Sequence, residues 1–288
     1  MKQAFGEQKR ISKKRRELIE QIDAIASDYS QRGMKLTVRQ CYYQLVSRGL
    51  IPNGAKEYSK VVDAVADGRL AGLLDWEAFE DRGRYVRENA HWNSPKEIIE
   101  DAARQYKIDT RQTQPYYSEA WIEKDSLVSI LEDICLPLDV PCFSCRGFSS
   151  VTALYEASER IKADGRPTII LYCGDHDPSG LRIAQNIAES LSQTFELTHL
   201  TFRRIGITPE QVQIMNLPPF PAKEKDKNYD WYVKTTGLTE AWEVDALPPE
   251  VLKKLYTDAI SEYTDFTELA RMREREKADK SYFSDLVA

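Results

Sequence analysis

The sequence places a tight acidic turn, Gly174-Asp-His-Asp-Pro-Ser-Gly180, between a short apolar run and an amphipathic segment. The preceding run, Thr168–Cys173, is apolar and contains β-branched residues, which is typical of a buried strand. Pro178 opens a predicted helix, because the first turn of a helix tolerates a residue without an N–H. Ligands of open α/β sheets bind at the carboxyl ends of strands, so this turn is a candidate site.

Two carboxylates, Asp175 and Asp177, share the turn and repel each other. A Mg²⁺ ion commonly offsets such repulsion. A structural alternative is that the aspartates cap the helix and stabilise the turn, which Asp often does. The turn alone leaves both interpretations open.

The same alternation of strand and helix extends over much of the chain, starting at Tyr116. It predicts a parallel sheet with helices on both faces, hence the α/β class. The predicted strands are Tyr117–Ile122, Val140–Ser144, Thr168–Cys173 and Leu197–Ile205, and the predicted helices are Ser126–Cys135, Val151–Lys162 and the one after Pro178.

Polar residues follow three of these strands. Glu123 follows the first, Arg146 and Gly147 follow the second, and Asp175 and Asp177 follow the third. Because the carboxyl ends of parallel strands lie on one side, we expect the three carboxylates to converge. Such a set suits Mg²⁺, with Mn²⁺ as the alternative, although Glu123 taken alone is better interpreted as a surface carboxylate or a neighbour of a helix cap.

The N-terminal part has a different pattern, in which three helices precede a short charged stretch. Ser12 caps a helix over residues 12–31, and Thr37 caps Val38–Ser47. A third helix is expected over Ser59–Leu74, and Trp76–Val86 suits a small β-wing. Three helices and a wing form a winged helix, a helix-turn-helix variant whose short second helix approaches DNA.

The charge distribution favours a polyanion as partner. Residues 1–60 hold 13 Lys and Arg against 6 Asp and Glu, although the whole chain carries a net charge of −6. A basic N-terminal part on an acidic body indicates one polyanion-binding face, with a solvated helix face as the alternative. The basic residues that we expect to contact DNA are Lys13, Lys14, Arg15, Arg16 and Arg48, together with the strand-end residues Arg146 and Gly147.

Composition excludes several other classes of protein. No apolar run approaches the ~18 residues of a membrane span, so we expect no membrane partner. A polar, basic N-terminus and five irregularly spaced cysteines indicate the cytoplasm, and DNA binding would place the protein at the nucleoid. The sequence lacks a phosphate-binding Gly-Lys-Ser/Thr loop, which argues against an ATPase. The expected domains are 1–93, a linker 94–115, and 116–288.

Two separated motifs together resemble one family. Thr37-Val-Arg-Gln-Cys-Tyr-Tyr43 resembles the winged-helix segment of topoisomerase VI A subunits and of the meiotic double-strand-break transesterases. Trp121-Ile-Glu-Lys124, Arg146-Gly-Phe148 and the turn Asp175–Gly180 resemble the Toprim domain of the same proteins. The segment Trp242–Leu247 looks like the carboxylate-containing segment near the C-terminal end of the family.

The resemblance implies a site and a chemistry. Tyr43 would be the nucleophile, with Arg39 one helical turn earlier and Glu123 as a further catalytic residue. Glu123, Asp175 and Asp177 would hold Mg²⁺, and the product would be a 5′-phosphotyrosyl link to double-stranded DNA. In the family the tyrosine of one protomer meets the metal site of the other, which implies a homodimer.

The chain is shorter than typical A subunits, and the segment that engages the ATPase subunit in the family is not recognisable before the first predicted helix. A B-type ATPase subunit therefore stays an open question, and we expect a stand-alone DNA-breaking relative. Two alternatives also stay open. One is a hydrolytic Toprim nuclease in which Tyr43 only packs, and the other is a catalytically silent DNA-binding protein.

Overall fold

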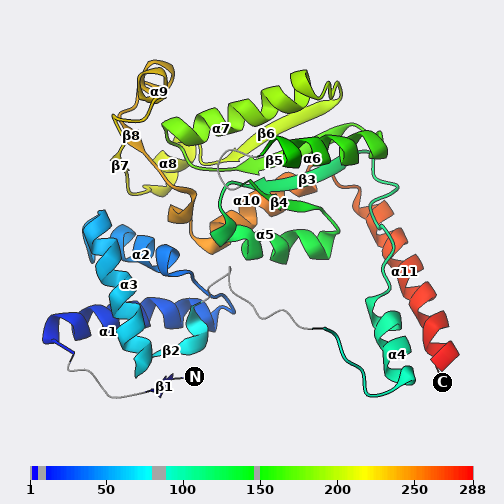
Figure 1. Ribbon diagram of the computed structural model, residues 1–288, viewed down its shortest axis with the longest axis horizontal. Coiled ribbons are helices and arrows are strands. Elements are labelled where there is room, and N and C mark those ends of the chain that lie inside the picture. The colour runs from blue at the N-terminus through cyan, green and yellow to red at the C-terminus, as the bar shows by residue number, and fades with distance from the viewer. Residues whose placement is uncertain (1, 6–10, 80–88, 146–149, 288) are drawn as a thin grey trace.

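Apolar strands build the centre of the molecule, for which a computed structural model describes residues 2–5, 11–79, 89–145 and 150–287. Within these residues, four parallel strands form one sheet in the order β4-β3-β5-β6 (Figure 1). The strands are β3 (Tyr117–Ile122), β4 (Cys142–Ser144), β5 (Thr168–Cys173) and β6 (Leu200–Gly206). This confirms the predicted parallel sheet, and β5 is buried along its whole length, as its apolar sequence requires.

Helices cover both faces of the sheet (Figure 1). On one face Ile122 and Leu171 pack with α5 and α10, and on the other Trp121 and Tyr172 pack with α6 and α7. Successive strand residues point to opposite faces, so one strand supplies both layers. The helices are α5 (Val128–Cys135), α6 (Val151–Asp164), α7 (Pro178–Glu189), α8 (Pro209–Met215) and α10 (Pro249–Ser261).

The N-terminal part is a separate helical unit with its own core of apolar residues. Ser12 and Thr37 cap the first two helices as predicted, each accepting a hydrogen bond from a backbone N–H in the first turn. The elements are β1 (Lys2–Ala4), α1 (Lys13–Gln31), α2 (Val38–Ser47), α3 (Ala55–Leu70) and β2 (Ala71–Asp75).

The structure differs from the sequence prediction at the end of the third helix. We expected a helix up to Leu74, but α3 ends at Leu70 and β2 follows, paired antiparallel with β1. Gly72 has a φ of +69°, which is left-handed backbone that ends a helix and suits glycine. In the expected wing, Trp76–Ala78 form a 3₁₀ turn, and residues 80–86 lie outside the described part of the chain.

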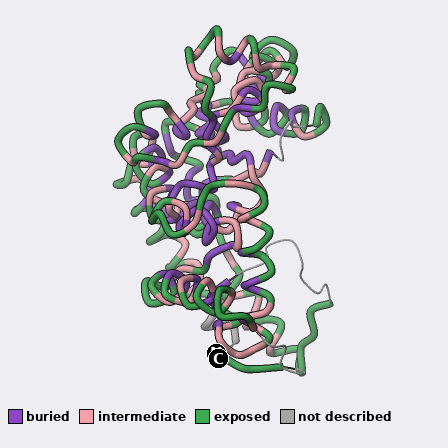
Figure 2. Tube along the Cα trace, turned by 90° about the vertical axis from the view of Figure 1, so that its left-hand side faces the viewer, coloured by how far each residue is buried: buried purple, intermediate pink, exposed green. Residues whose placement is uncertain are grey.

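Two further parts complete the chain. The helices α4 and α11 lie side by side and extend away from the sheet (Figure 1), joined by a hydrogen bond from Tyr106 to Asp279. Buried residues are concentrated in the sheet layers and the N-terminal helices, whereas α4 has none (Figure 2). The bounds are α4 (Pro95–Gln105), β7 (Phe220–Pro221), α9 (Tyr229–Thr236), β8 (Glu240–Ala241) and α11 (Phe266–Val287).

Candidate functional site

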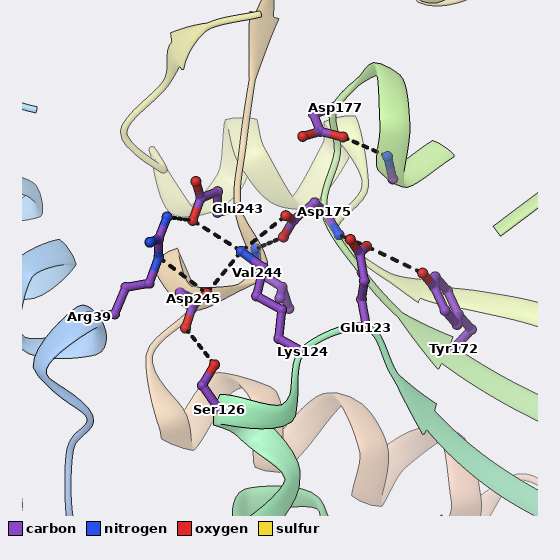
Figure 3. A network of polar contacts seen from close by, with 12 residues as sticks. Arg39, Glu123, Lys124, Ser126, Tyr172, Asp175, Asp177, Glu243, Val244 and Asp245 are labelled. Atoms are coloured by element: carbon purple, nitrogen blue, oxygen red, sulfur yellow. Dashed lines mark hydrogen bonds and ion pairs between the residues drawn. The ribbon is translucent and has the colours of Figure 1, made fainter. Parts of the chain in front are cut away.

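The carboxyl edge of the sheet carries all three carboxylates that the sequence selected (Figure 3). Glu123 directly follows β3, Asp175 lies two residues after β5, and Asp177 caps α7. Because β3 and β5 are parallel neighbours, their carboxyl ends lie together and hold Glu123 against the turn after β5. Parallel pairing therefore brings together residues that are more than fifty positions apart in the sequence.

Glu123 is buried and fastened to the turn. Its Oε2 accepts hydrogen bonds from the backbone N–H of Asp175 at 2.9 Å and from the hydroxyl of Tyr172 at 3.3 Å. Burial raises the pKa of Glu123, and the charge of Asp177 adds to the effect. A Cβ on Gly174 would lie 2.6 Å from Oε2, so this close approach requires glycine.

Asp175 is also buried and uses both oxygens. Its Oδ1 accepts the backbone N–H of Val244 at 2.7 Å, and its Oδ2 lies 3.0 Å from Lys124 Nζ. Burial raises the pKa of Asp175, and the charge of Glu123 adds to this, against the lowering effect of Lys124. The carboxylate of Asp175 is therefore destabilised by burial and by neighbouring negative charge, and the ammonium of Lys124 offsets part of this cost.

Asp177 has the structural role that the turn alone suggested as an alternative. Its Oδ1 accepts the backbone N–H of Gly180 at 2.6 Å and so caps α7. Burial raises its pKa. The capping bond uses one carboxylate oxygen and leaves the other oxygen for a further partner, so capping and ligand binding are compatible at this residue.

Lys124 stands at the centre of a second carboxylate group, which the sequence analysis did not select as a site. Its Nζ lies 3.0 Å from oxygens of Asp175, Glu243 and Asp245 (Figure 3). Burial disfavours its charge, but these three carboxylates raise the pKa of Lys124. The available signal was the Glu243-Val-Asp245 spacing, which repeats the two-residue spacing of Asp175 and Asp177.

Arg39 connects the N-terminal helices to this edge. From α2 its guanidinium pairs with Glu243, and its Nε lies 3.6 Å from Asp245 Oδ2. Ala246, next in the chain, packs into the apolar core of the N-terminal helices. The paired Lys124 and Arg39 together lower the pKa of Glu243, although burial opposes this. One short turn, Val244–Ala246, therefore joins the two parts of the molecule.

Tyr43 lies one helical turn beyond Arg39 and is 3% exposed. The Arg39 guanidinium stands 5.9 Å from the centre of its ring. Burial raises the pKa of Tyr43, and Glu243 adds to this effect, which outweighs the lowering by Arg39 and Lys124. The structure thus places Tyr43 beside the carboxylates of its own chain, with a phenol that is harder to ionise than free tyrosine.

The expected DNA-contacting residues are spread over the N-terminal helices. Lys13, Lys14 and Arg16 are exposed near the start of α1. Arg15 instead pairs with Asp67 of α3. Arg48 lies 3.6 Å from Asp28, while Arg146 and Gly147 lie outside the described residues.

The carboxylates fit Mg²⁺ in their donor chemistry. All three offer oxygen ligands, Glu123 and Asp175 from buried positions and Asp177 from a half-buried one, and their charges repel one another. No three acidic, His or Cys side chains of the described residues already form a metal-binding group. Mg²⁺ is usually held by only one or two carboxylates plus water and phosphate, so a site here would not need all three of Glu123, Asp175 and Asp177 as direct ligands.

Comparison with known proteins finds no matching family model and no matching curated sequence. None of the helices in the described part of the chain is both long and apolar enough to cross a membrane.

Proposed function

We propose that this protein is a Mg²⁺-dependent DNA-strand-breaking enzyme of the topoisomerase VI A type, with Tyr43 as nucleophile. The observation that carries the proposal is the pairing of Arg39 with Glu243 beside Lys124 and Asp175. Through this contact the helix that bears Tyr43 lies at the carboxylate edge of the sheet. A nucleophile, two cations and a set of possible metal ligands therefore occupy one region, as phosphoryl transfer requires.

The proposed step breaks one bond and forms one. The Tyr43 oxygen attacks a DNA phosphorus and forms a phosphotyrosyl ester. The bond from that phosphorus to the 3′ oxygen breaks, and the phenol proton ends on the released 3′ hydroxyl. Glu123, Asp175 and Asp177 would hold Mg²⁺, which would supply positive charge to the phosphate and the leaving oxygen.

The cations of the chain have separate roles in this step. A DNA phosphate replaces Glu243 as the partner of Arg39, because a guanidinium binds both kinds of oxyanion. The phosphate-bound Arg39 then stands beside the phenol and favours its ionised form. Lys124 stays between Asp175 and Asp245 and limits the repulsion among the carboxylates.

Covalent attachment tests the proposal directly. Purified protein is incubated with internally labelled linear and supercoiled DNA and Mg²⁺, denatured with detergent, and assayed for label on the protein. We expect attachment in the wild type and none in Tyr43→Phe. Tyr42→Phe is the matched control, because the Tyr42 hydroxyl bonds Asn53 and Gly54 and not the site. Attachment in Tyr43→Phe equal to that in the wild type would refute the proposal that Tyr43 is the nucleophile.

We further propose that the N-terminal helices, with β1 and β2, are a winged-helix DNA-binding domain. The exposed Lys13, Lys14 and Arg16 support this, since phosphate contacts by such residues dominate DNA affinity. Affinity is expected to fall steeply with salt, and Lys14→Gln to reduce the slope of log K against log salt by about one. An unchanged slope in Lys14→Gln would remove α1 from the interface.

A hydrolytic nuclease is the second candidate, and the burial of Tyr43 favours it. In that case water attacks the phosphorus and Tyr43 only packs between the two parts of the molecule. The same assay separates the two, because hydrolysis gives cut DNA without attached protein and persists in Tyr43→Phe. DNA binding without cutting would instead indicate the silent DNA-binding protein.

A further inference from the structure

A second polar region lies at the opposite, amino end of the sheet. A cavity of about 350 Å³ opens there beside the first residues of β3, between the sheet and the segment that links it to α4. Lys107, Arg111 and Arg166 line it, together with Ser118 of β3. This volume lies at the lower end of the range for small-molecule sites and exceeds the space of a bare ion.

Arg111 is a buried cation without an acidic partner. It is 4% exposed, yet it forms no ion pair with any residue in the described ranges. Its guanidinium donates only to neutral oxygens, the carbonyl of Leu138 at 3.4 Å and the hydroxyl of Thr264 at 3.1 Å. Burial lowers the pKa of Arg111, and the nearby charge of Arg166 lowers it further, against the raising effect of Asp139 and Asp109. A buried guanidinium without a directly paired anion is costly, so an anion at this place would stabilise it beyond the charges of Asp109 and Asp139.

Ser118 supplies a second, independent signal. Its side chain is buried, and its hydroxyl has no hydrogen-bond partner within the described chain. Buried hydroxyls are normally hydrogen-bonded, because an unpaired one forfeits its bonds to water. Ser118 alternates with Glu119 along β3 and so faces the layer of α5 and α10, where the neighbours of Arg111 lie.

The two acids at the cavity, Asp109 and Asp139, form no ion pair with the guanidinium of Arg111 and are engaged by backbone and hydroxyl groups. Asp139 Oδ2 accepts both the backbone N–H and the hydroxyl of Thr110, at 2.8 and 2.9 Å. Asp109 Oδ1 accepts the backbone N–H of Arg111 at 2.8 Å, so it shapes the turn. Arg166 is held by Asp164, outside the cavity lining, and by two backbone carbonyls. The lining as a whole has three cations against two carboxylates.

We propose that this cavity binds a small organic phosphate, whose oxyanion pairs with Arg111 and accepts the hydroxyl of Ser118. A guanidinium donates two parallel hydrogen bonds to such a group, and the exposed Lys107 adds a second charge at the cavity. Tyr116 also lines the cavity and offers an aromatic contact for an organic part of the ligand. The site is separate from the carboxylate edge and does not depend on the DNA-breaking function.

The test uses the full chain and two probes, inorganic phosphate and phenyl phosphate, at constant ionic strength against chloride. Calorimetry is expected to give millimolar or tighter binding, tighter for phenyl phosphate. Lys107→Gln and Ser118→Ala are expected to weaken it about fivefold and threefold, and Arg111→Met to abolish it. Lys35→Gln removes an exposed lysine elsewhere and is the matched control, with unchanged affinity expected.

Hydrogen exchange locates the bound probe. Binding at the cavity is expected to slow exchange at residues 107–118, whereas phosphate at the carboxylate edge would slow it at 174–180. Unchanged affinity in both Lys107→Gln and Ser118→Ala, or protection only at 174–180, would overturn the proposal. So would a loss in Lys35→Gln equal to that in Lys107→Gln, because the binding would then be nonspecific. These variants keep the test decisive if Arg111→Met does not fold.

Discussion

The two ends of the sheet differ in the sign of the buried charge that lacks a full set of partners. At the carboxyl end the carboxylates outnumber the cations, and Lys124 and Arg39 offset part of the excess from within the chain. At the amino end the buried Arg111 has no ion-pair partner among the residues described. Additional positive charge would therefore stabilise the carboxyl end, and additional negative charge would stabilise the amino end.

This difference shows how a parallel sheet separates chemistry along its strands. The carboxyl end collects residues from the turns after β3 and β5, whereas the amino end collects the segments that enter the same strands. Cys173 and Thr168 mark these two ends of one buried strand. The two sites therefore share a rigid support without sharing any side chain.

The largest expected effect is at Lys124. Lys124→Met leaves Asp175, Glu243 and Asp245 without their shared ammonium, so we expect a loss of about 3 kcal/mol of unfolding free energy in EDTA. Mg²⁺ is expected to restore part of it by replacing the lost charge. Urea unfolding with and without Mg²⁺ measures both values.

The control for this experiment is Lys253→Met, which breaks a surface pair with Asp133 and is expected to cost ~0.5 kcal/mol or less. A loss below about 1 kcal/mol in Lys124→Met, comparable to that at a surface pair, would contradict the proposed strain at the carboxyl end.

An intermediate effect is expected at the glycines of the two ends. A Cβ on Gly180 would lie 2.4 Å from the Asp175 carbonyl, so Gly180→Ala is expected to cost about 2 to 3 kcal/mol. Gly165, near the amino end of β5, has open space around it but a φ of +77°, and Gly165→Ala is expected to cost about 1 kcal/mol. Thermal unfolding measures the loss of stability in both variants. Equal losses would show that the backbone of the turn after β5 shifts to accommodate the added Cβ atom.

The smallest effect is expected for two serine hydroxyls, that of Ser126, which forms a hydrogen bond, and that of Ser118, which forms none among the described residues. Ser126 donates to Asp245 at 3.3 Å, so Ser126→Ala is expected to lose about 1 kcal/mol. In the part of the chain that the structure describes, the buried hydroxyl of Ser118 forms no hydrogen bond that stabilises the free protein. Ser118→Ala is therefore expected to leave the free energy of unfolding unchanged or to raise it by up to about 1 kcal/mol. Chemical unfolding in chloride buffer measures both, and a clear loss in Ser118→Ala would argue for an internal partner.

The two inner strands of the sheet were predictable from their short, mostly apolar sequences, whereas the edge strands β4 and β6 begin two and three residues later than predicted. Thr168–Cys173 and Tyr117–Ile122 agree with the prediction at both ends, since glycine, proline and acidic residues bound them. The helix bounded by Pro178 was predictable for the same reason. At Leu73 the apolar period suggested a continuing helix, but the left-handed backbone at Gly72 ends it.

The site was predictable only in part. Strand ends place Glu123 beside the Asp175 turn, which sequence order and the parallel sheet together imply. The pairing of Arg39 with Glu243 joins residues 204 positions apart, and no local pattern carries such a contact. The role of Lys124 was not predictable, because a lysine after a strand is ordinarily solvated, and only the folded chain surrounds it with acids.

The late position of α10 in the chain affects how the protein matures during translation. Its Tyr256 donates a hydrogen bond to the carbonyl of Trp121, and Leu252 and Ile260 complete one apolar face of the sheet. The N-terminal helices draw almost all of their core from the first 79 residues and are able to collapse while the ribosome is still synthesising the sheet. In contrast, the face of the sheet that packs against α10 stays partly exposed until residue 260 has left the exit tunnel. During that interval the exposed apolar surface of the nascent sheet favours aggregation.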